Sequence, residues 1–82
     1  MKTANQVKLH LITPQICSVL SAQGEHVGNL KQIGGVWKFK AIGYGADGGV
    51  IPGGGPLTNR HNTTFDVLDE VLISRELTLP CV

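Results

Sequence analysis

The chain has 82 residues, a formal net charge of +1, 41% hydrophobic residues and 5% aromatic residues. This length is that of one ordinary domain, so we expect a single small domain over residues 1–82. The apolar runs are far shorter than the roughly 20 residues that cross a bilayer, and residues 1–6, predicted to be a flexible terminus, lack the apolar segment of a secretory signal. We therefore expect a cytoplasmic protein that does not enter a membrane.

The cysteines and histidines do not form a recognisable site. Cys17 and Cys81 have neither the density of a disulfide scaffold nor the spacing of zinc ligands, and we expect both to be reduced, with Cys17 buried and Cys81 in the tail. The three histidines lack the paired spacing of metal ligands. Because neither a nucleophile with its base nor a pair of catalytic carboxylates can be recognised, we expect no metal, no cofactor and no enzymatic activity.

Residues 7–42 have the pattern of an antiparallel meander. Each run alternates apolar and polar residues or is rich in β-branched residues, and short turn signals separate the runs. Gly34 and Gly35 lie between two runs with no spare residue, which indicates a two-residue turn with positive φ at both positions. Turns this short join antiparallel neighbours, because parallel strands need long crossovers. The four predicted strands cover residues 7–11, 16–22, 26–33 and 36–42.

Residues 43–62 are predicted to be a long surface loop. The chain contains eleven glycines, nearly double the usual share, and seven of them lie in this segment, which has no periodicity and includes Pro52 and Pro56. Residues 43–48 match the G-x-G-x-x-G pattern of dinucleotide-binding proteins, but no helix can begin at the third glycine with a proline so close behind it. We therefore predict an adaptable connector and exclude a dinucleotide site.

Residues 63–75 are predicted to form one amphipathic helix. Asn62, Thr63 or Thr64 can cap its start, and the acidic residues that follow favour the positive end of the helix dipole. The apolar stripe expected to face the core consists of Phe65, Val67, Leu68, Val71 and Leu72. Apolar residues also alternate over residues 71–79, so a fifth strand is left open, with residues 76–82 as a tail or short strand.

The Gly34–Gly35 turn fixes the register of the sheet. It places Ile33 opposite Val36, and Lys31 opposite Lys38. Because side chains alternate between faces, one face becomes the core face, which the helix should cover. The core face comprises Val7, Leu9, Leu11, Cys17, Val19, Leu30, Trp37, Phe39 and Ala41. The other face carries Lys8, His10, Ser18, Asn29, Lys31, Lys38 and Lys40, with Ile12, Ile16, Leu20, Val27, Ile33, Val36 and Ile42 among them.

The predicted fold is therefore α+β: a four-stranded antiparallel meander, a long glycine-rich loop and one C-terminal helix packed on one sheet face. Four of the five lysines lie on the other face. Like charges opposed across two strands cost up to about 1 kcal/mol, which an anionic partner would relieve. The alternative interpretation is that these lysines are solvated and only keep the sheet soluble.

Two functional hypotheses follow. The first is a non-enzymatic binding or assembly domain, either a homodimer or a protein-binding module, which buries the aliphatic residues of the lysine-bearing face and uses the glycine-rich loop as a contact surface. The alternative is weak binding of an anion or a nucleic acid through that face. The candidate binding residues are Lys8, Lys31, Lys38, Lys40, Arg60 and His61.

Overall fold

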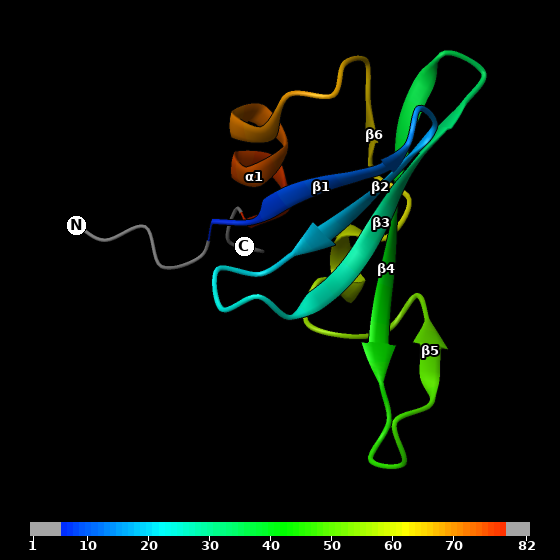
Figure 1. The fold of residues 1–82 in the computed structure, drawn as a ribbon, viewed down its shortest axis with the longest axis vertical. Coiled ribbons are helices and arrows are strands. Elements are labelled where there is room, and N and C mark those ends of the chain that lie inside the picture. The colour runs from blue at the N-terminus through cyan, green and yellow to red at the C-terminus, as the bar shows by residue number, and fades with distance from the viewer. Residues whose placement is uncertain (1–5, 79–82) are drawn as a thin grey trace.

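The computed structural model describes residues 6–78. They form an α+β fold, as predicted, in which an antiparallel sheet of six strands is joined by one α-helix (Figure 1). The strands are β1 (Lys8–Thr13), β2 (Ile16–Leu20), β3 (His26–Ile33), β4 (Val36–Tyr44), β5 (Val50–Pro52) and β6 (Thr64–Phe65). A 3-10 helix, η1 (Thr58–Arg60), precedes β6, and the helix α1 (Glu70–Thr78) follows it.

The first four strands pair in chain order, which confirms the predicted meander. Gly34 and Gly35 join β3 to β4 with φ angles of 58° and 88°, as a two-residue turn requires. The predicted register is confirmed, with Ile33 opposite Val36 and Leu30 opposite Phe39. A turn of fixed length specifies the register because a slip of one residue would move every side chain to the wrong face.

The sheet is larger than predicted, because residues 43–62, expected to be a long surface loop, contain the strand β5 and the 3-10 helix η1. β4 continues to Tyr44, and β5 pairs with its last residues, so that Tyr44 lies opposite Val50. Beyond β5 the backbone turns back onto β4. A Cβ atom on Gly43 would lie 2.5 Å from the backbone nitrogen of Gly55. Glycine avoids this clash because it has no Cβ atom. Glycine here lets two backbone segments touch, which fixes the segment in place.

The helix begins later and ends later than predicted. It runs from Glu70 to Thr78, whereas the sequence pattern indicated residues 63–75. Thr64 and Phe65 instead form β6, which pairs with the first half of β4. A β-branched residue and an aromatic residue suit a strand, and the outer edge of β4 offers them backbone partners. The alternative of a strand over residues 71–79 is wrong for residues 71–78, which belong to α1. Residues 79–82, including Cys81, lie outside the described residues.

The helix cap and the buried helix face also differ from the prediction. Asp69 caps α1, because its Oδ1 accepts a hydrogen bond from the Leu72 amide at 3.1 Å; Asn62, Thr63 and Thr64 lie upstream of the helix or in β6. Val71, expected on the core face, is 78% exposed. The buried residues of α1 are Ile73, Ser74 and Leu77.

Contacts with β1 set this orientation of α1, which lies beside β1 in Figure 1. The Val7 amide donates a hydrogen bond to Ser74 Oγ at 2.9 Å, and the Leu9 amide donates to Glu70 Oε2 at 2.9 Å. Both amides lie along the outer edge of the sheet, where β1 has no neighbouring strand among residues 6–78. The helix thus supplies acceptors that a neighbouring strand would have supplied, and the side chains of the following turns are carried into the core. Leu11, which was predicted to lie in the core, is 56% exposed.

The core lies between the sheet and α1. Its residues are Val7, Cys17, Val19, Val27, Leu30, Trp37, Phe39, Ala41, Phe65, Ile73 and Leu77. Val27 corrects the prediction, which placed it on the opposite face. The pairing of β2 with β3 shifts there: Val19 lies opposite Gly28 and Leu20 opposite His26. Val27 is therefore the extra residue of a bulge, and it turns inward.

Candidate functional site

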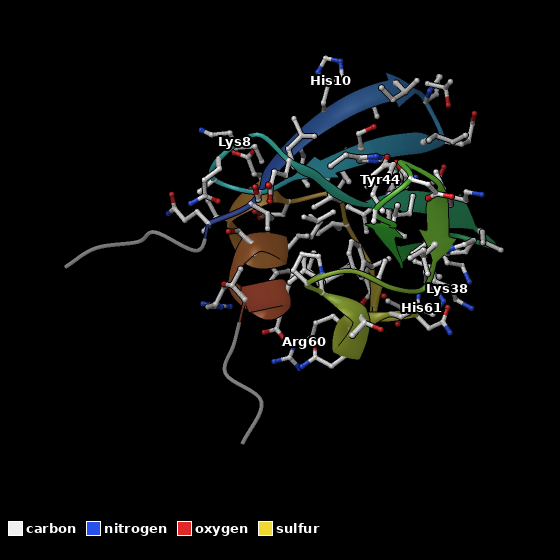
Figure 2. All side chains as sticks on the ribbon, turned by 90° about the horizontal axis from the view of Figure 1, so that it is seen from below. Lys8, His10, Lys38, Tyr44, Arg60 and His61 are labelled. Atoms are coloured by element: carbon white, nitrogen blue, oxygen red, sulfur yellow. The ribbon has the colours of Figure 1, made fainter. Side chains whose placement is uncertain are left out.

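The strands of the meander expose one face that no described element covers, because α1 lies on the other side. We call it the lysine face and define it by its polar and aromatic residues: Lys8, His10, Ser18, His26, Asn29, Lys31, Lys38, Lys40 and Tyr44. Figure 2 shows Lys8, His10 and Lys38 directed away from α1. The strand register places Lys31 and Lys40 on this same side, since they pair with or alternate with Lys38.

The lysine face is arranged in rows that run across the strands. One row is polar along its whole length: His10 pairs with Ser18, Ser18 with Asn29, and Asn29 with Lys40. In the next row Lys31 lies directly opposite Lys38. The strand residues of the lysine face include no carboxylate. The nearest acidic residues along the chain stand in turns at the ends of strands, at positions 25 and 47.

Tyr44, His26 and Asn29 form a hydrogen-bonded chain at one end of the lysine face. The distance from the Tyr44 hydroxyl to His26 Nδ1 is 2.9 Å, and that from His26 Nε2 to Asn29 Oδ1 is also 2.9 Å. Since Oδ1 can only accept, Nε2 donates to it, and in the tautomer that carries its hydrogen on Nε2 the Nδ1 atom accepts a hydrogen bond from the Tyr44 hydroxyl. This arrangement holds the tyrosine ring beside the imidazole, with 6.3 Å between ring centroids and 48° between ring planes.

Sequence reasoning missed Tyr44 because it ended the fourth strand at residue 42. The signal that could have found it is the two-residue alternation, which puts residue 44 on the same face as Lys38 and Lys40 once the strand is extended. Sequence reasoning also did not count His26 among the candidate binding residues. The prediction that Trp37 and Phe39 lie in the core is confirmed.

His61 and Asn62, near the lysine face, act on the backbone of β4. His61 Nδ1 accepts a hydrogen bond from the Ala41 amide at 3.0 Å, at the outer edge of β4 between the segments that pair with β5 and β6. Asn62 adopts φ 74° and donates its amide to the Phe39 carbonyl at 2.7 Å. Its Oδ1 accepts a hydrogen bond from Lys40 Nζ at 2.7 Å. His61 therefore completes the sheet edge, and Asn62 positions Lys40.

Arg60 does not join the lysines. It lines a pocket of about 360 Å³ on the α1 side of the sheet, whose floor includes the buried residues Val27 and Leu77. In Figure 2 it lies on the same side as α1. Of the six residues predicted to bind a ligand, Lys31, Lys38 and Lys40 lie close together on β3 and β4, while Lys8 lies on the same face but on β1, with β2 between. His61 bonds to the backbone of β4, and Arg60 lies on the α1 side of the sheet.

The described residues offer neither a reactive thiol nor a cluster of metal ligands. Cys17 is buried in the core, and burial raises the pKa of its thiol, which keeps it protonated and unreactive. Among residues 6–78 no group of three or more His, Cys, Asp or Glu side chains could hold a metal ion. The α-helix of the described chain is too short and too polar to cross a membrane.

Comparisons with models of protein families, with curated proteins and with solved structures found no match to this chain.

Proposed function

We propose that this chain is a non-enzymatic binding domain that works through the lysine face, and that its ligand is a polyanion of the nucleic-acid type. The observation that carries the proposal is the direct opposition of Lys31 and Lys38. Two like charges in that position destabilise a sheet by up to about 1 kcal/mol. A phosphate placed between them turns this cost into a favourable contact, so binding and folding reinforce each other.

The charge distribution also favours an anion over a second copy of the same face. A two-fold contact centred on Lys31 and Lys38 would bring these pairs of both copies together, and like charges across an interface oppose association. Asp69, Glu70 and Arg75 lie elsewhere, on or before α1. The formal net charge of +1 thus understates how basic this one face is.

Salt dependence tests the proposal. Each neutralised phosphate of a single strand contributes about −0.7 to the slope of log affinity against log salt, so four lysines predict a slope of about −3. Between about 50 and 200 mM salt the affinity should fall roughly 50-fold. The measurement is fluorescence anisotropy with a labelled thymidine dodecamer.

A matched pair of variants locates the contact. Lys38→Gln should reduce the slope by about 0.7 and weaken binding at every salt concentration. Arg75→Gln removes the same charge from an exposed position on α1 and should leave both quantities unchanged. The proposal fails if the wild-type protein does not bind at the lower salt concentration, or if Arg75→Gln weakens binding as much as Lys38→Gln.

Self-association is a second candidate function, and a different observation favours it. Ile12 and Ile33 are each about half exposed, at 55% and 51%, and Ile16 is also exposed; all three lie toward the end of the sheet that holds the β1–β2 and β3–β4 turns. An apolar cluster of this kind is a common protein contact surface. Light scattering at micromolar concentration should then show a dimer that Ile33→Ser converts to a monomer, and a wild-type monomer would eliminate this candidate.

A further inference from the structure

Tyr44 is the exception among the aromatic residues of this chain. The sequence contains one Trp, one Tyr and two Phe. Trp37, Phe39 and Phe65 are buried in the core, whereas Tyr44 is 52% exposed. A half-exposed aromatic ring forgoes part of the hydrophobic stabilisation that burial would give the fold. Exposed tyrosines are enriched where proteins bind ligands.

The ring of Tyr44 is held in place before any ligand arrives. Its hydroxyl is tied to His26, and His26 is tied in turn to Asn29, at 2.9 Å in each case. Fixing a side chain beforehand lowers the entropy lost on binding, which is about 0.5–1.5 kcal/mol for a side chain immobilised at an interface. The hydrogen bonds use the edge groups of both rings, so a face of the Tyr44 ring stays available for stacking.

The spacing along β4 relates this ring to the charges. Lys38, Lys40 and Tyr44 project from the same side of one strand. At about 3.3 Å per residue, about 7 Å separates the two lysines and about 13 Å separates Lys40 from Tyr44. Asn29, the last member of the Tyr44 hydrogen-bonded chain, lies directly opposite Lys40. Phosphate-binding groups and a stacking ring therefore follow one another along a single line.

From this arrangement we propose that the ligand of the lysine face is a single-stranded nucleic acid, with one base stacked on Tyr44 and the preceding or following phosphates at Lys40, Lys38 and Lys31. The inference rests on the proposed function and narrows its ligand class. A duplex keeps the faces of its bases stacked inside, where Tyr44 cannot reach them, while a single strand presents them. Stacking accepts any base, so the expected preference is for strandedness and not for sequence.

The experiment compares ligands with the same phosphates and different bases. The probes are a thymidine dodecamer, an abasic single strand of the same length and a duplex of the same length, each titrated by anisotropy against the wild-type protein. One stacked base is worth about 1–3 kcal/mol, so the thymidine strand should bind at least about fivefold more tightly than the abasic strand. It should also bind more tightly than the duplex.

The variants assign that difference to the ring. Tyr44→Ala should bring the thymidine strand down to the affinity of the abasic strand, and leave the abasic affinity unchanged. Tyr44→Phe keeps the ring and should retain most of the difference. Val50→Ala, which shortens the exposed neighbour opposite Tyr44, is the matched control and should change nothing. Fluorescence of the buried Trp37 checks that each variant is folded.

Each outcome separates the two proposals. If the thymidine and abasic strands bind equally well to the wild-type protein, or if the duplex binds as tightly as the single strand, the stacking inference is wrong while the proposed function stands. The stacking inference is also wrong if Tyr44→Ala keeps the full difference. If none of the three probes binds at low salt, the proposed function itself is wrong.

Discussion

Replacing Gly28 by alanine tests how the sheet is packed. Gly28 lies in β3 beneath the ring of Phe39, and a Cβ atom there would stand 2.5 Å from Phe39 Cζ and 2.7 Å from the Lys40 carbonyl oxygen. Non-bonded carbons prefer separations of about 3.5–4.0 Å. Phe39 is completely buried, so its ring has no open space to move into, and the Lys40 carbonyl belongs to the paired strand β4.

The size of the effect follows from two opposing contributions. Adding atoms to a close-packed core costs about 1–3 kcal/mol, and the contact with backbone places this site toward the upper end. Replacing glycine also lowers the conformational entropy of the unfolded chain, which stabilises the folded state by about 0.4–1 kcal/mol. We expect Gly28→Ala to lower the free energy of unfolding by about 2 kcal/mol, a large share of the roughly 4–12 kcal/mol that about 0.05–0.15 kcal/mol per residue gives a chain of this length.

Urea titration of the Trp37 fluorescence measures this change. The midpoint should fall while the slope of the transition stays constant, because the folded and unfolded surfaces are nearly unchanged. A double-mutant cycle with Phe39→Leu identifies the cause. Leucine is smaller, so the double variant should be more stable than the sum of the single effects predicts, by about 1 kcal/mol.

Gly24→Ala is the control for the backbone effect of losing a glycine. Gly24 has φ +88° with no atom within 4 Å of its added Cβ, so its cost comes from backbone conformation alone and should not depend on Phe39. The reasoning is refuted if Gly28→Ala changes stability by less than about 0.5 kcal/mol, the range of an ordinary surface substitution. Strict additivity with Phe39→Leu would also refute it.

Four further predictions concern the edges, the lysines and the thiol. His61→Ala leaves a β4 amide without its acceptor and should cost about 1–3 kcal/mol by urea titration. Asp69→Ala removes the helix cap and should cost about 1 kcal/mol. Lys31→Glu converts the opposition with Lys38 into an attraction; it should raise stability by a few tenths of a kcal/mol to about 1 and weaken oligonucleotide binding. Burial raises the pKa of the Cys17 thiol in the folded protein. The stabilisation that the buried neutral thiol provides is therefore complete below the ordinary thiol pKa and is lost as the pH rises toward the raised value. Cys17→Ala should reduce this loss of stability at alkaline pH.

The controls for these variants lie close to the changed residues. Asp66→Ala removes an exposed carboxylate that caps nothing among the described contacts and should be neutral, in contrast to Asp69→Ala. His61→Asn offers another acceptor and should recover part of the loss. Equal destabilisation by both aspartate variants, or no loss for His61→Ala, would contradict the assigned contacts. A stability gain from Lys31→Glu without weaker binding would separate the lysine opposition from ligand binding.

Local features of the chain were sufficient to predict the meander and its two faces. The two glycines at 34 and 35 fix which residues pair, because a two-residue turn leaves no choice of register. Alternation along each strand then separates Phe39 from Lys38 and Lys40, whatever the rest of the chain does. These are contacts between near neighbours in sequence, so their pattern can be read directly.

The remaining features depend on partners far apart in the chain. Phe65 suits a helix face or a strand equally well, and only the open edge of β4 makes it a strand residue. The face that α1 buries was predicted wrongly because the outward amide of Val7 donates to Ser74 and that of Leu9 donates to Glu70.

The chain as a whole divides between features set by local sequence and features set by distant contacts. The sequence by itself determined the turns, the register and a face that carries four of the five lysines. The tertiary structure alone decided that residues 43–62 fold back on β4 and that His61 completes its edge. The physical reason is that an edge strand has unpaired amides and carbonyls which must find partners, and which segment provides them depends on the whole fold.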